Sequence, residues 1–301
     1  MREKYDIIVV GGGPAGSMAA RYAAENGVDV CLLEKTRDIG YPVRCGEAVG
    51  HAGVTQFVEM QDSWIAEKID SCTLVSPNGI KLDVPFANET GYILNRRIFD
   101  YDLSRIASKA GAQIFTKAHV TDLIYTDGKI SGVKVNHLGE EKNIRAKLII
   151  GADGVDSRIG RWAGLKTTVK LKDMESCMQY SVSNIDVRRN NMTMFVGQNY
   201  APGGYIWIFP KGDNFANIGL GISGKYSKDK SAKKYLDEFM YREFPNASIH
   251  TSMCGGCPVA YPIKKPVADN IIIVGDAAHH INPVTGGGIT PAMKSGMLGG
   301  L

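Results

Sequence analysis

The glycines of segment 11–16 are the first residues whose spacing points to chemistry. The segment reads Gly-Gly-Gly-Pro-Ala-Gly and lies between an apolar run and a helix-like stretch. In a Gly-x-Gly-x-x-Gly turn, Gly11 permits the tight bend, Gly13 lets the backbone approach a pyrophosphate, and Gly16 lets the helix pack on the sheet. The start of that helix offers N–H groups to phosphate oxygens. Glu34 ends the next apolar run, where a carboxylate accepts hydrogen bonds from ribose hydroxyls. We therefore expect a dinucleotide whose ribose carries no additional phosphate, as in FAD or NAD.

Two acidic turns occur later in the chain. Segment 151–157 reads Gly-Ala-Asp-Gly-Val-Asp-Ser, and segment 275–279 reads Gly-Asp-Ala-Ala-His. Taken singly, each fits a turn after a strand that needs small residues. All three motifs, in this order, resemble those of the FAD-dependent monooxygenase-like superfamily. The resemblance implies that FAD is the cofactor, with Asp276 on its ribityl chain or pyrophosphate, Asp153 bracing the domain nearby and Arg96 against the cofactor.

Apolar periodicity predicts the elements that hold these turns. Short β-branched runs indicate buried parallel strands over 5–10, 28–33, 147–150 and 270–274. Helical spacing extends over 17–26, ended by Gly27, and over 96–111. Another helix begins near Ile289, and the segment before it presents backbone donors suited to negative charge on flavin carbonyls.

Alternation of apolar and polar residues marks a second kind of segment. It occurs over 72–95 and 170–222 and is typical of half-buried antiparallel strands. We therefore predict an α/β fold, in which a Rossmann-type FAD-binding domain carries an inserted antiparallel β-rich substrate domain. The FAD-binding domain is expected at residues 1–71, 96–169 and 263–301, and the substrate domain at 72–95 and 170–262.

Segment 202–210 carries three alternating aromatic residues and reads Pro-Gly-Gly-Tyr-Ile-Trp-Ile-Phe-Pro. On a strand, Tyr205, Trp207 and Phe209 project from one face. An aromatic face packed on a core would explain this pattern without a function. The segment also resembles the Pro-x-x-Tyr-x-Trp-x-Phe-Pro motif of the geranylgeranyl reductase family, whose aromatics wall a long apolar cavity that reaches the flavin.

Two further stretches carry the same resemblance: segment 44–47, Arg-Cys-Gly-Glu, and segment 255–259, Gly-Gly-Cys-Pro-Val. The resemblance covers essentially the whole chain and is greatest with archaeal digeranylgeranylglycerophospholipid reductases. It implies an FAD-dependent oxidoreductase that acts on CH–CH groups. Such an enzyme saturates isoprenoid double bonds of geranylgeranylated membrane lipids with a hydride from reduced flavin and a proton.

Three sets of site residues are expected. The catalytic set is Cys45, Tyr205 and Trp207, and the substrate set is Tyr205, Trp207, Phe209 and Pro283. The residues expected to bind the cofactor are Gly11, Gly13, Pro14, Ala15, Gly16, Glu34, Lys35, Arg44, Cys45, Gly46, Arg96, Val120, Asp153, Gly154, Gly275, Asp276, Gly287, Gly288 and Ile289. The proton donor stays open among Tyr205, Cys45, His279, His280 and ordered water. Hydrogen bonding in support of the site is the expected role of both histidines.

The cysteines allow more than one interpretation. Cys45 is either a small buried residue of a glycine-rich loop or a thiol near the flavin that tunes its redox state, with Glu47 as a proton relay. Cys254 and Cys257 form a Cys-x-x-Cys, but the chain lacks the second pair that a zinc site requires. We therefore expect a packed turn there and no metal site.

Composition limits the partners and the location. Apolar residues make up 44% and charged residues 22% of the chain, as in ordinary soluble proteins. The net charge is +4, and the Lys and Arg residues form no basic cluster interleaved with aromatic residues. We therefore expect no nucleic-acid partner. Without a secretory signal or a membrane-spanning run, we expect a cytoplasmic protein, peripheral at the inner face of the cell membrane. The expected partners are a prenylated lipid substrate, a transient membrane surface and an external electron donor, which is ferredoxin, a deazaflavin or a nicotinamide.

Other functions share the cofactor motifs. They are an aromatic hydroxylase or monooxygenase, a membrane-associated electron-transfer flavoprotein, and a flavin-binding remnant without turnover. The aromatic strand and the Cys-Gly-Glu loop favour the reductase, and the chain lacks the cysteine-rich iron–sulfur segment of an electron carrier. Because the family continues past the position of Leu301, we expect the FAD-binding domain to be C-terminally shortened relative to it.

Overall fold

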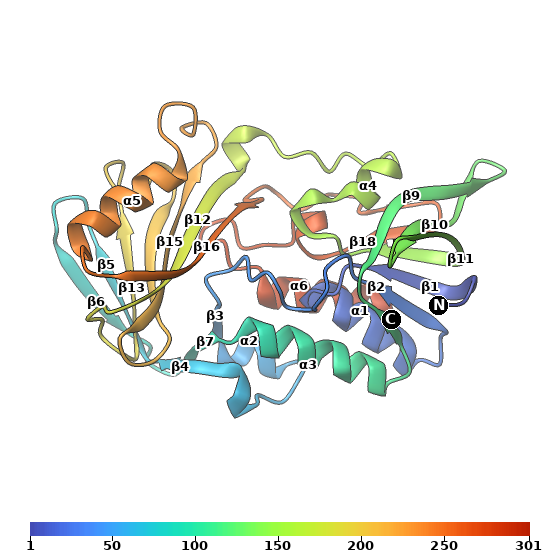
Figure 1. Cartoon of the computed structure of the whole chain (residues 1–301), viewed down its shortest axis with the longest axis horizontal. Helices are drawn as coiled ribbons and strands as arrows, with labels where there is room; N and C mark the ends of the chain where they lie inside the picture. Colours follow the sequence, from blue (N-terminus) through green and yellow to red (C-terminus); the bar gives the residue numbers. More distant parts are fainter. The chain divides into compact units, whose positions relative to one another are not determined.

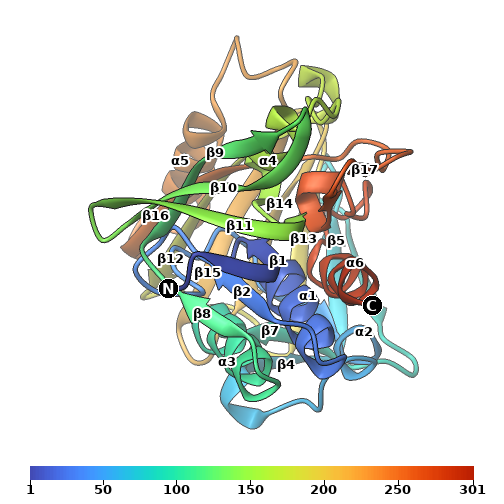
Figure 2. The same cartoon turned by 90° about the vertical axis from the view of Figure 1, so that its right-hand side faces the viewer.

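The parallel strands predicted around the glycine turn form the centre of an eight-stranded sheet. A computed structural model describes residues 1–301 and places this sheet in the first of two compact units, Met1–Pro42, Arg96–Thr168 and Ala260–Leu301. β1 (Lys4–Val10) pairs in parallel with β2 (Val30–Leu33) and with the end of β11 (Glu140–Gly151). The strand order along the sheet is β17-β18-β11-β1-β2-β8. Figure 2 shows β11, β1, β2 and β8 of this series side by side.

The first unit has the following other elements. Its remaining strands are β8 (Gln113–Phe115), β9 (Ala118–Thr126), β10 (Lys129–His137), β17 (Val267–Ala268) and β18 (Ile271–Ile273). Its α-helices are α1 (Pro14–Glu25), α3 (Arg96–Lys109), α4 (Arg158–Trp162) and α6 (Ile289–Gly300). The 3-10 turns η2 (Gly154–Asp156) and η4 (Gly275–Ala278) follow the ends of β11 and β18.

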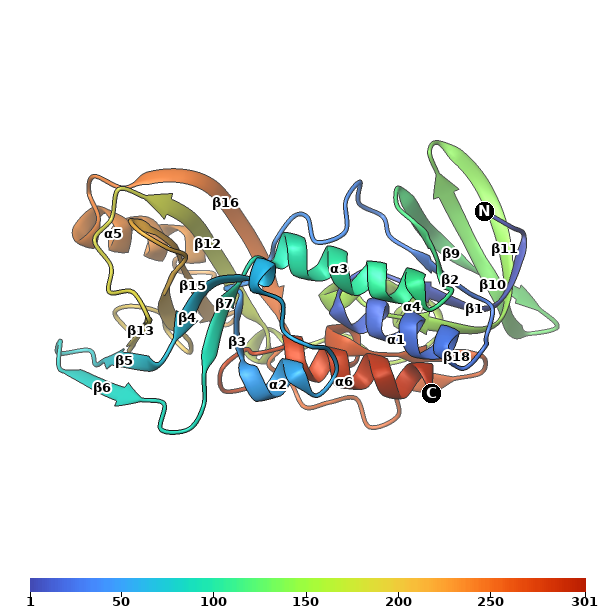
Figure 3. The same ribbon diagram turned by 90° about the horizontal axis from the view of Figure 1, so that it is seen from below.

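Small residues let α1 lie against α6. The two helices, with α3 alongside, run next to one another in Figure 3. A Cβ added at Gly296 would lie 2.1 Å from the carbonyl oxygen of Ala15, and one at Gly300 would lie 2.4 Å from that of Ala19. Any side chain at these glycines would push the helices apart, so α6 holds the start of α1, and with it the glycine turn, in place.

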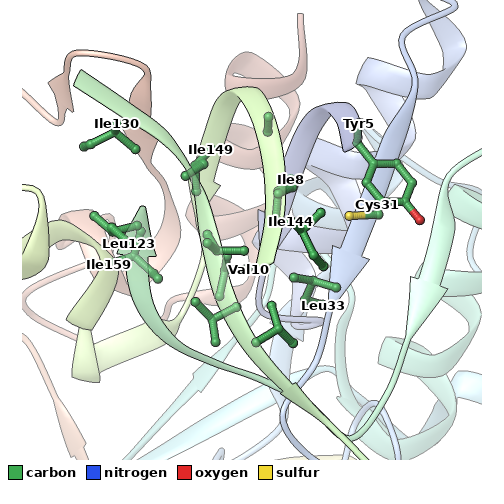
Figure 4. Packing of buried hydrophobic residues seen from close by; sticks show 14 of the residues in the cluster. Tyr5, Ile8, Val10, Cys31, Leu33, Leu123, Ile130, Ile144, Ile149 and Ile159 are labelled. Atoms are coloured by element: carbon green, nitrogen blue, oxygen red, sulfur yellow. The ribbon is translucent and has the colours of Figure 1, made fainter. Parts of the chain in front are cut away.

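An antiparallel hairpin extends the sheet of the first unit. β10 pairs with β9 and with the first half of β11, whose second half pairs in parallel with β1. The hydrophobic cluster drawn in Figure 4 joins the hairpin to the parallel strands. It contains Ile8, Val10 and Leu33 from the parallel strands and Leu123, Ile130 and Ile144 from β9, β10 and the first half of β11. The sequence analysis had assigned no strands to 118–137, so this part of the fold was missed.

A seven-stranded sheet with the strand order β16-β12-β15-β14-β13-β5-β6 forms most of the second unit, Val43–Asn95 and Val169–Val259 (Figure 1). Its strands are β5 (Ser71–Val75), β6 (Lys81–Pro85), β12 (Glu175–Ser183), β13 (Asn191–Val196), β14 (Tyr205–Pro210), β15 (Phe215–Ser223) and β16 (Ser248–Cys257). The strands are antiparallel except for β5 and β13, which pair in parallel.

One helix covers one face of this sheet. α5 (Ala232–Glu243) begins at Ser231, whose hydroxyl accepts a hydrogen bond from the N–H of Lys234. Its buried side chains Leu236, Phe239 and Met240 pack on the apolar residues that β12, β14 and β15 direct to that face. The core of the second unit therefore lies between α5 and the sheet, and the other face of the sheet lies outside this core.

The segment 43–71 belongs to the second unit, although the sequence analysis assigned it to the FAD-binding domain. It holds β3 (Ala48–Gly50), α2 (His51–Thr55), η1 (Asp62–Trp64) and β4 (Ile65–Ile69). Both strands pair with β7 (Gly91–Leu94) in a three-stranded sheet. Because β3 and β4 pair with a later strand of the second unit, the segment lies in that unit and not in the FAD-binding domain assigned from sequence. The last remaining turn, η3 (Leu171–Asp173), precedes β12. No helix of the chain is both long and apolar enough to span a bilayer.

Candidate functional site

The glycine turn of the first unit has the geometry that its spacing predicts. Gly11 has φ +109°, and a Cβ there would lie 2.3 Å from the carbonyl oxygen of Ala152, so only glycine fits. The space in front of Gly13 is open, with no heavy atom within 4 Å of an added Cβ. Helix α1 begins with Pro14 and leaves its first N–H groups at this opening. The turn therefore offers a cradle for an anionic group.

Glu34 is tied to the glycine turn by its own carboxylate. Its Oε2 accepts a hydrogen bond of 2.7 Å from the N–H of Gly12, and its Oε1 accepts two of 2.8 Å from the N–H and hydroxyl of Thr36. A carboxylate has about four lone-pair sites, so these bonds leave capacity for one further donor such as a ribose hydroxyl. The side chain thus fixes the turn and still fits the predicted role.

A cavity of about 120 Å³ lies beside this turn within the first unit. Among the residues predicted from sequence, it is lined by Gly11, Gly13, Glu34, Lys35, Val120 and Asp153. The lining residues that the prediction missed include His119, Asp156, Arg158 and Trp162. His119 lies on β9, a strand that the periodicity did not indicate. The other three follow Asp153 closely, and Asp156 was part of the quoted motif.

Asp153 provides a test of whether this cavity fits a nucleotide. Its Oδ2 accepts a hydrogen bond of 3.1 Å from the N–H of Ile159, whereas its Oδ1 is buried without a partner in the protein. Burial raises the pKa of this carboxyl above its ordinary value. A buried acceptor without a donor is costly, and a hydroxyl of a bound ligand would satisfy it. The residues present therefore fit a nucleotide cofactor.

The second acidic turn of this unit lies at the start of α6. The N–H of Gly275 donates to the hydroxyl of Ser295 over 2.9 Å. A Cβ added at Gly288 would lie 3.1 Å from Oδ1 of Asp276, so the carboxylate is close to the first residues of α6. The N–H groups of Ile289 and Thr290 precede the intrahelical hydrogen-bond ladder and remain available at this end. A carboxylate and a helix N-terminus therefore lie together, as the motif predicts.

Arg96 lies near this turn and is held by its own helix. It makes two hydrogen bonds of 2.7 Å to the carboxylate of Asp100, one turn further along α3. Burial raises the pKa of Asp276, and the positive charge of Arg96 opposes part of this rise. Arg96 is therefore close enough to Asp276 to act on its charge.

The two histidines after this turn differ in environment. The buried ring of His279 contacts the carbonyl oxygens of Thr167 at 3.0 Å and Tyr261 at 3.3 Å, so it joins segments of the first unit. Burial lowers the pKa of His280, and its Nδ1 is buried without a partner. Pro283 lies in the exposed turn that follows and shares no unit with the other predicted substrate residues.

The three aromatic residues of β14 lie on one face of the second unit's sheet. The ring centroids of Tyr205 and Trp207 are 5.9 Å apart, and those of Trp207 and Phe209 are 6.1 Å apart with the rings stacked. The intervening Ile206 and Ile208 point to the other face and join the core under α5. The aromatic face is therefore not the one on which the main core packs.

Glycines on the neighbouring strand make room for these rings. Gly219 of β15 is the register partner of Trp207, and a Cβ there would lie 2.4 Å from the indole ring. The indole ring therefore lies directly against the backbone of β15 at Gly219. Toward the sheet edge, the cross-strand row continues from Trp207 through Met194 and Leu74 to Leu82 of β6, which is 60% exposed. An apolar row therefore crosses the sheet from the aromatic strand to its edge.

The loop 44–47 packs on this aromatic face. A Cβ at Gly46 would lie 2.7 Å from the ring of Phe209, which explains the glycine at this position. The amide of Gln179 donates a 3.0 Å hydrogen bond to the carbonyl oxygen of Cys45. Cys45 Sγ accepts a hydrogen bond of 3.2 Å from the N–H of Glu47. The thiol therefore sits in a loop that is fixed to the sheet.

Glu47 anchors the end of this loop. Its carboxylate is 3% exposed, forms an ion pair with Lys211 and accepts a 2.7 Å hydrogen bond from Asn217. Its backbone has φ +75°, which is uncommon for a residue with a side chain. A carboxylate held in this way is a structural anchor, so the structure gives no support to Glu47 as a proton relay.

A group of titratable side chains lies around Tyr205, the first residue of the aromatic row. Burial raises the pKa of Tyr205, with smaller effects from Cys257, Cys177, Cys45 and Glu175. Burial also raises the pKa of Cys177 to about 12, aided by the nearby Glu175. The group thus combines a phenol, three thiols and one carboxyl, and sequence analysis had not identified Glu175 or Cys177.

Cys254 and Cys257 are not in a packed turn, which corrects the sequence-based expectation. Both lie on β16, which pairs with β12 along its whole length. The run of small residues in this segment belongs to β16, which is the edge strand of the sheet. There the exposed Gly255 and Gly256 stand opposite Cys177 and Ser176.

The predicted site residues therefore fall into two groups, one in each unit. The first unit brings together the glycine turn, Glu34 and Asp153, and it places Asp276 beside the start of α6. The second unit brings together the aromatic row and the loop that contains Arg44, Cys45 and Gly46. The contact of these three loop residues with the cofactor stays a prediction.

Comparisons with known proteins are consistent with both groups. The sequence matches the family model of the geranylgeranyl reductase catalytic domain over residues 173–257 and that of pyridine nucleotide-disulphide oxidoreductases over residues 5–198. It is 44% identical to the digeranylgeranylglycerophospholipid reductase of Methanocella arvoryzae over 303 aligned positions, which cover 100% of this chain and 77% of the relative.

Solved structures give the same result. A geranylgeranyl bacteriochlorophyll reductase-like protein from Thermoplasma acidophilum superimposes with a TM-score of 0.93 at 38% identity, over 98% of this chain and 76% of that one. A flavin-dependent brominase superimposes with a TM-score of 0.81 at 21% identity, over 97% of this chain and 78% of the other, which shows a shared fold alone.

Proposed function

The chain belongs to the geranylgeranyl reductase family, and from this premise we propose that it is an FAD-dependent reductase of geranylgeranylated membrane lipids. The reaction saturates isoprenoid double bonds. The observation that carries this proposal is the aromatic row Tyr205, Trp207 and Phe209, which lies on the sheet face away from the main core and continues as an apolar row to the sheet edge.

FAD is assigned to the first unit. The glycine turn would hold the pyrophosphate, Glu34 would accept a hydrogen bond from a ribose hydroxyl, and Asp153 would receive the donor that its Oδ1 lacks. Asp276 and the N–H groups at the start of α6 would bind further along the cofactor. When bound and reduced, flavin supplies the hydride.

The prenyl chain is assigned to the face of the second unit's sheet that carries the aromatic row, where Phe209 packs with Ile69 and Ile93. Strands lie about 4.8 Å apart, so the row from Trp207 to Leu82 spans roughly 14 Å across three strand spacings. Met194 and Leu74 between them present no charge to an isoprenoid chain. The aromatic rings exclude water from the double bond and stabilise transient positive charge by their π faces.

A lipid surface is the proposed partner of the sheet edge. Ile80, Leu82 and Val84 are 65%, 60% and 39% exposed, and they alternate along the edge of the sheet. A lipid whose prenyl chain enters from a bilayer would meet this apolar edge first. This contact is peripheral, and it agrees with a cytoplasmic enzyme that receives its electrons from an external donor.

An anaerobic single turnover tests the proposed function. The purified protein is reduced with dithionite and mixed with a geranylgeranylated glycerophospholipid, while the flavin spectrum and the mass of the lipid are followed. Reoxidation with a gain of two hydrogens per double bond is expected. A flavin that stays reduced until oxygen is admitted would instead indicate a hydroxylase or an electron carrier.

Trp207→Ala connects this test to the aromatic face. We expect turnover of the prenyl lipid to fall at least about tenfold, while flavin content is retained. Tyr241→Ala is a matched control, because Tyr241 is 83% exposed in the same unit. Equal loss of flavin and turnover in Trp207→Ala would assign the indole to folding.

A further inference from the structure

Glu175 places a carboxyl group in a notch of the sheet face that carries the aromatic row. The notch exists because two glycines meet there. A Cβ added at Gly204 would lie 2.9 Å from Oε2 of Glu175, and one added at Gly221 would lie 3.4 Å from it. Gly204 directly precedes Tyr205, and Gly221 is the register partner of Tyr205. The carboxyl oxygen therefore lies over bare backbone beside the phenol.

This carboxyl oxygen is enclosed without being satisfied. Oε2 of Glu175 is buried and has no hydrogen-bond partner in the protein. A buried carboxylate without a partner is strongly disfavoured, whereas a carboxylic acid tolerates the same site. The environment thus favours the protonated form, which has an O–H to donate.

The groups that face Glu175 supply no compensating positive charge. They are Cys177 on its own strand, Tyr205 on β14 and Cys257 opposite it on β16, and Cys45 of the loop lies near Tyr205. The charged side chains on neighbouring segments, Arg44 and Lys172, are exposed. Burial is accordingly the cause that raises the pKa of Glu175, to about 7.

We propose that Glu175 is the general acid of the reduction, the group that protonates the double bond held on the aromatic face. This inference rests on the proposed function. Reduction of the double bond needs one hydride and one proton. Bound reduced flavin would supply the hydride that bonds to one olefinic carbon, and the carboxyl O–H of Glu175 breaks as a C–H bond forms at the other. Oxidised flavin and the Glu175 carboxylate remain, and a proton from water restores the acid.

Proton affinity distinguishes Glu175 from its neighbours. A general acid works best when its pKa lies near the operating pH. The pKa of Cys177 is raised to about 12 and burial also raises the pKa of Tyr205, so both release protons reluctantly. Glu175 alone among these three has a pKa near neutral pH, so it can both give up a proton and take one back from water.

Glu175→Gln tests this role because it keeps the shape and neutrality of the acid but cannot donate a carboxyl proton. Flavin reoxidation by the prenyl lipid is measured in anaerobic single turnovers between pH 5 and 9. The wild-type rate is expected to fall as pH rises through about 7, because the acid must be protonated. The variant is expected to lose at least about 100-fold in rate and to lose this pH dependence.

An infrared titration gives a readout that does not depend on turnover. The wild-type protein should show the carbonyl band of a protonated carboxylic acid that disappears near neutral pH, and Glu175→Gln should lack that band. Glu243→Gln, on the exposed surface of α5, should keep both the band and the rate. Glu175→Asp should keep a pH-dependent rate, because it retains a carboxyl.

The outcomes separate this inference from the proposed function. A wild-type protein that leaves the lipid unsaturated overturns the proposed function, whatever the infrared band shows. A wild-type protein that saturates the lipid while Glu175→Gln keeps its rate overturns only the role of Glu175. A variant that is slower but keeps the wild-type pH profile also overturns it, since Glu175 would then act through structure.

Discussion

The indole N–H of Trp207 donates a 3.1 Å hydrogen bond to the amide oxygen of Gln179, whose own amide nitrogen donates to the carbonyl of Cys45. Gln179 is 8% exposed and bridges the aromatic strand and the Cys-Gly-Glu loop. Two elements that are distant in the sequence are thus held together by one side chain that neither family motif contains.

Gln179→Leu should therefore destabilise the second unit and disorder the loop. The substitution leaves a buried N–H and a buried carbonyl without partners, which costs about 1–3 kcal/mol. We expect this loss in the free energy of unfolding measured by urea titration, together with faster reaction of Cys45 with a thiol reagent. The exposed Gln198 offers a control, because Gln198→Leu should change neither quantity.

Gly219→Ala should displace the Trp207 ring. The new methyl group would overlap the indole, and overpacking of this kind costs about 1–3 kcal/mol. Gly255→Ala on the same sheet is a matched control, because the nearest atom to an added Cβ there is 4.0 Å away. Tryptophan fluorescence should shift in Gly219→Ala and stay unchanged in Gly255→Ala. Identical spectra for both variants would contradict the packing described for the indole.

Lys211→Met should be among the most damaging substitutions of the second unit. It leaves the buried Glu47 carboxylate without its ion-pair partner, which typically costs about 3–5 kcal/mol. Adding Glu47→Gln should restore part of the loss, because the amide carries no charge. A double-mutant cycle on the free energy of unfolding measures the coupling. Additive single effects would show that the pair does not act as a unit.

Glu34→Ala should weaken the binding of FAD at least about tenfold, equivalent to ~1.4 kcal/mol. The variant loses the proposed acceptor for a ribose hydroxyl and also the hydrogen bond that holds Gly12. Equilibrium titration of the apoprotein with FAD measures the change. The exposed Glu25 pairs with Arg21 on the same unit, and Glu25→Ala should bind FAD normally.

The cofactor half of the site could be predicted from sequence because its chemistry is local. A glycine turn, a strand end and a helix start follow one another in the chain, so the position of Glu34 beside Gly12 follows from one β–α–β arrangement. The shared face of Tyr205, Trp207 and Phe209 also follows from local alternation.

The remaining features depend on strand register, which alternation does not specify. The Glu175 notch requires Gly204, Gly221 and Cys177 to meet across three strands, and no local pattern links them. The face of the sheet that carries the main core could be identified only after α5 was found on it. The segment 43–71 was misplaced because its strands pair with β7, far along the chain.

The last prediction concerns stability and pH. Folding raises the pKa of Glu175 from 4.5 to about 7, so the folded protein binds more protons than the unfolded chain between these values. Glu175 therefore lowers the free energy of unfolding progressively as pH rises through this range. Allowing for solvent screening of a partly exposed side chain, the loss is roughly 1–2 kcal/mol.

Glu175→Gln removes this loss, because an amide does not titrate. The variant should gain stability relative to the wild type between pH 5 and pH 8, as measured by urea unfolding at both values. All other groups titrate alike in the two proteins, so the change in their difference isolates Glu175. Glu243→Gln should show no such pH-dependent gain in the free energy of unfolding, because the carboxylate of Glu243 is exposed. A difference between Glu175→Gln and the wild type that stays constant with pH would mean that Glu175 is ionised in the folded protein, and it could not then be the acid.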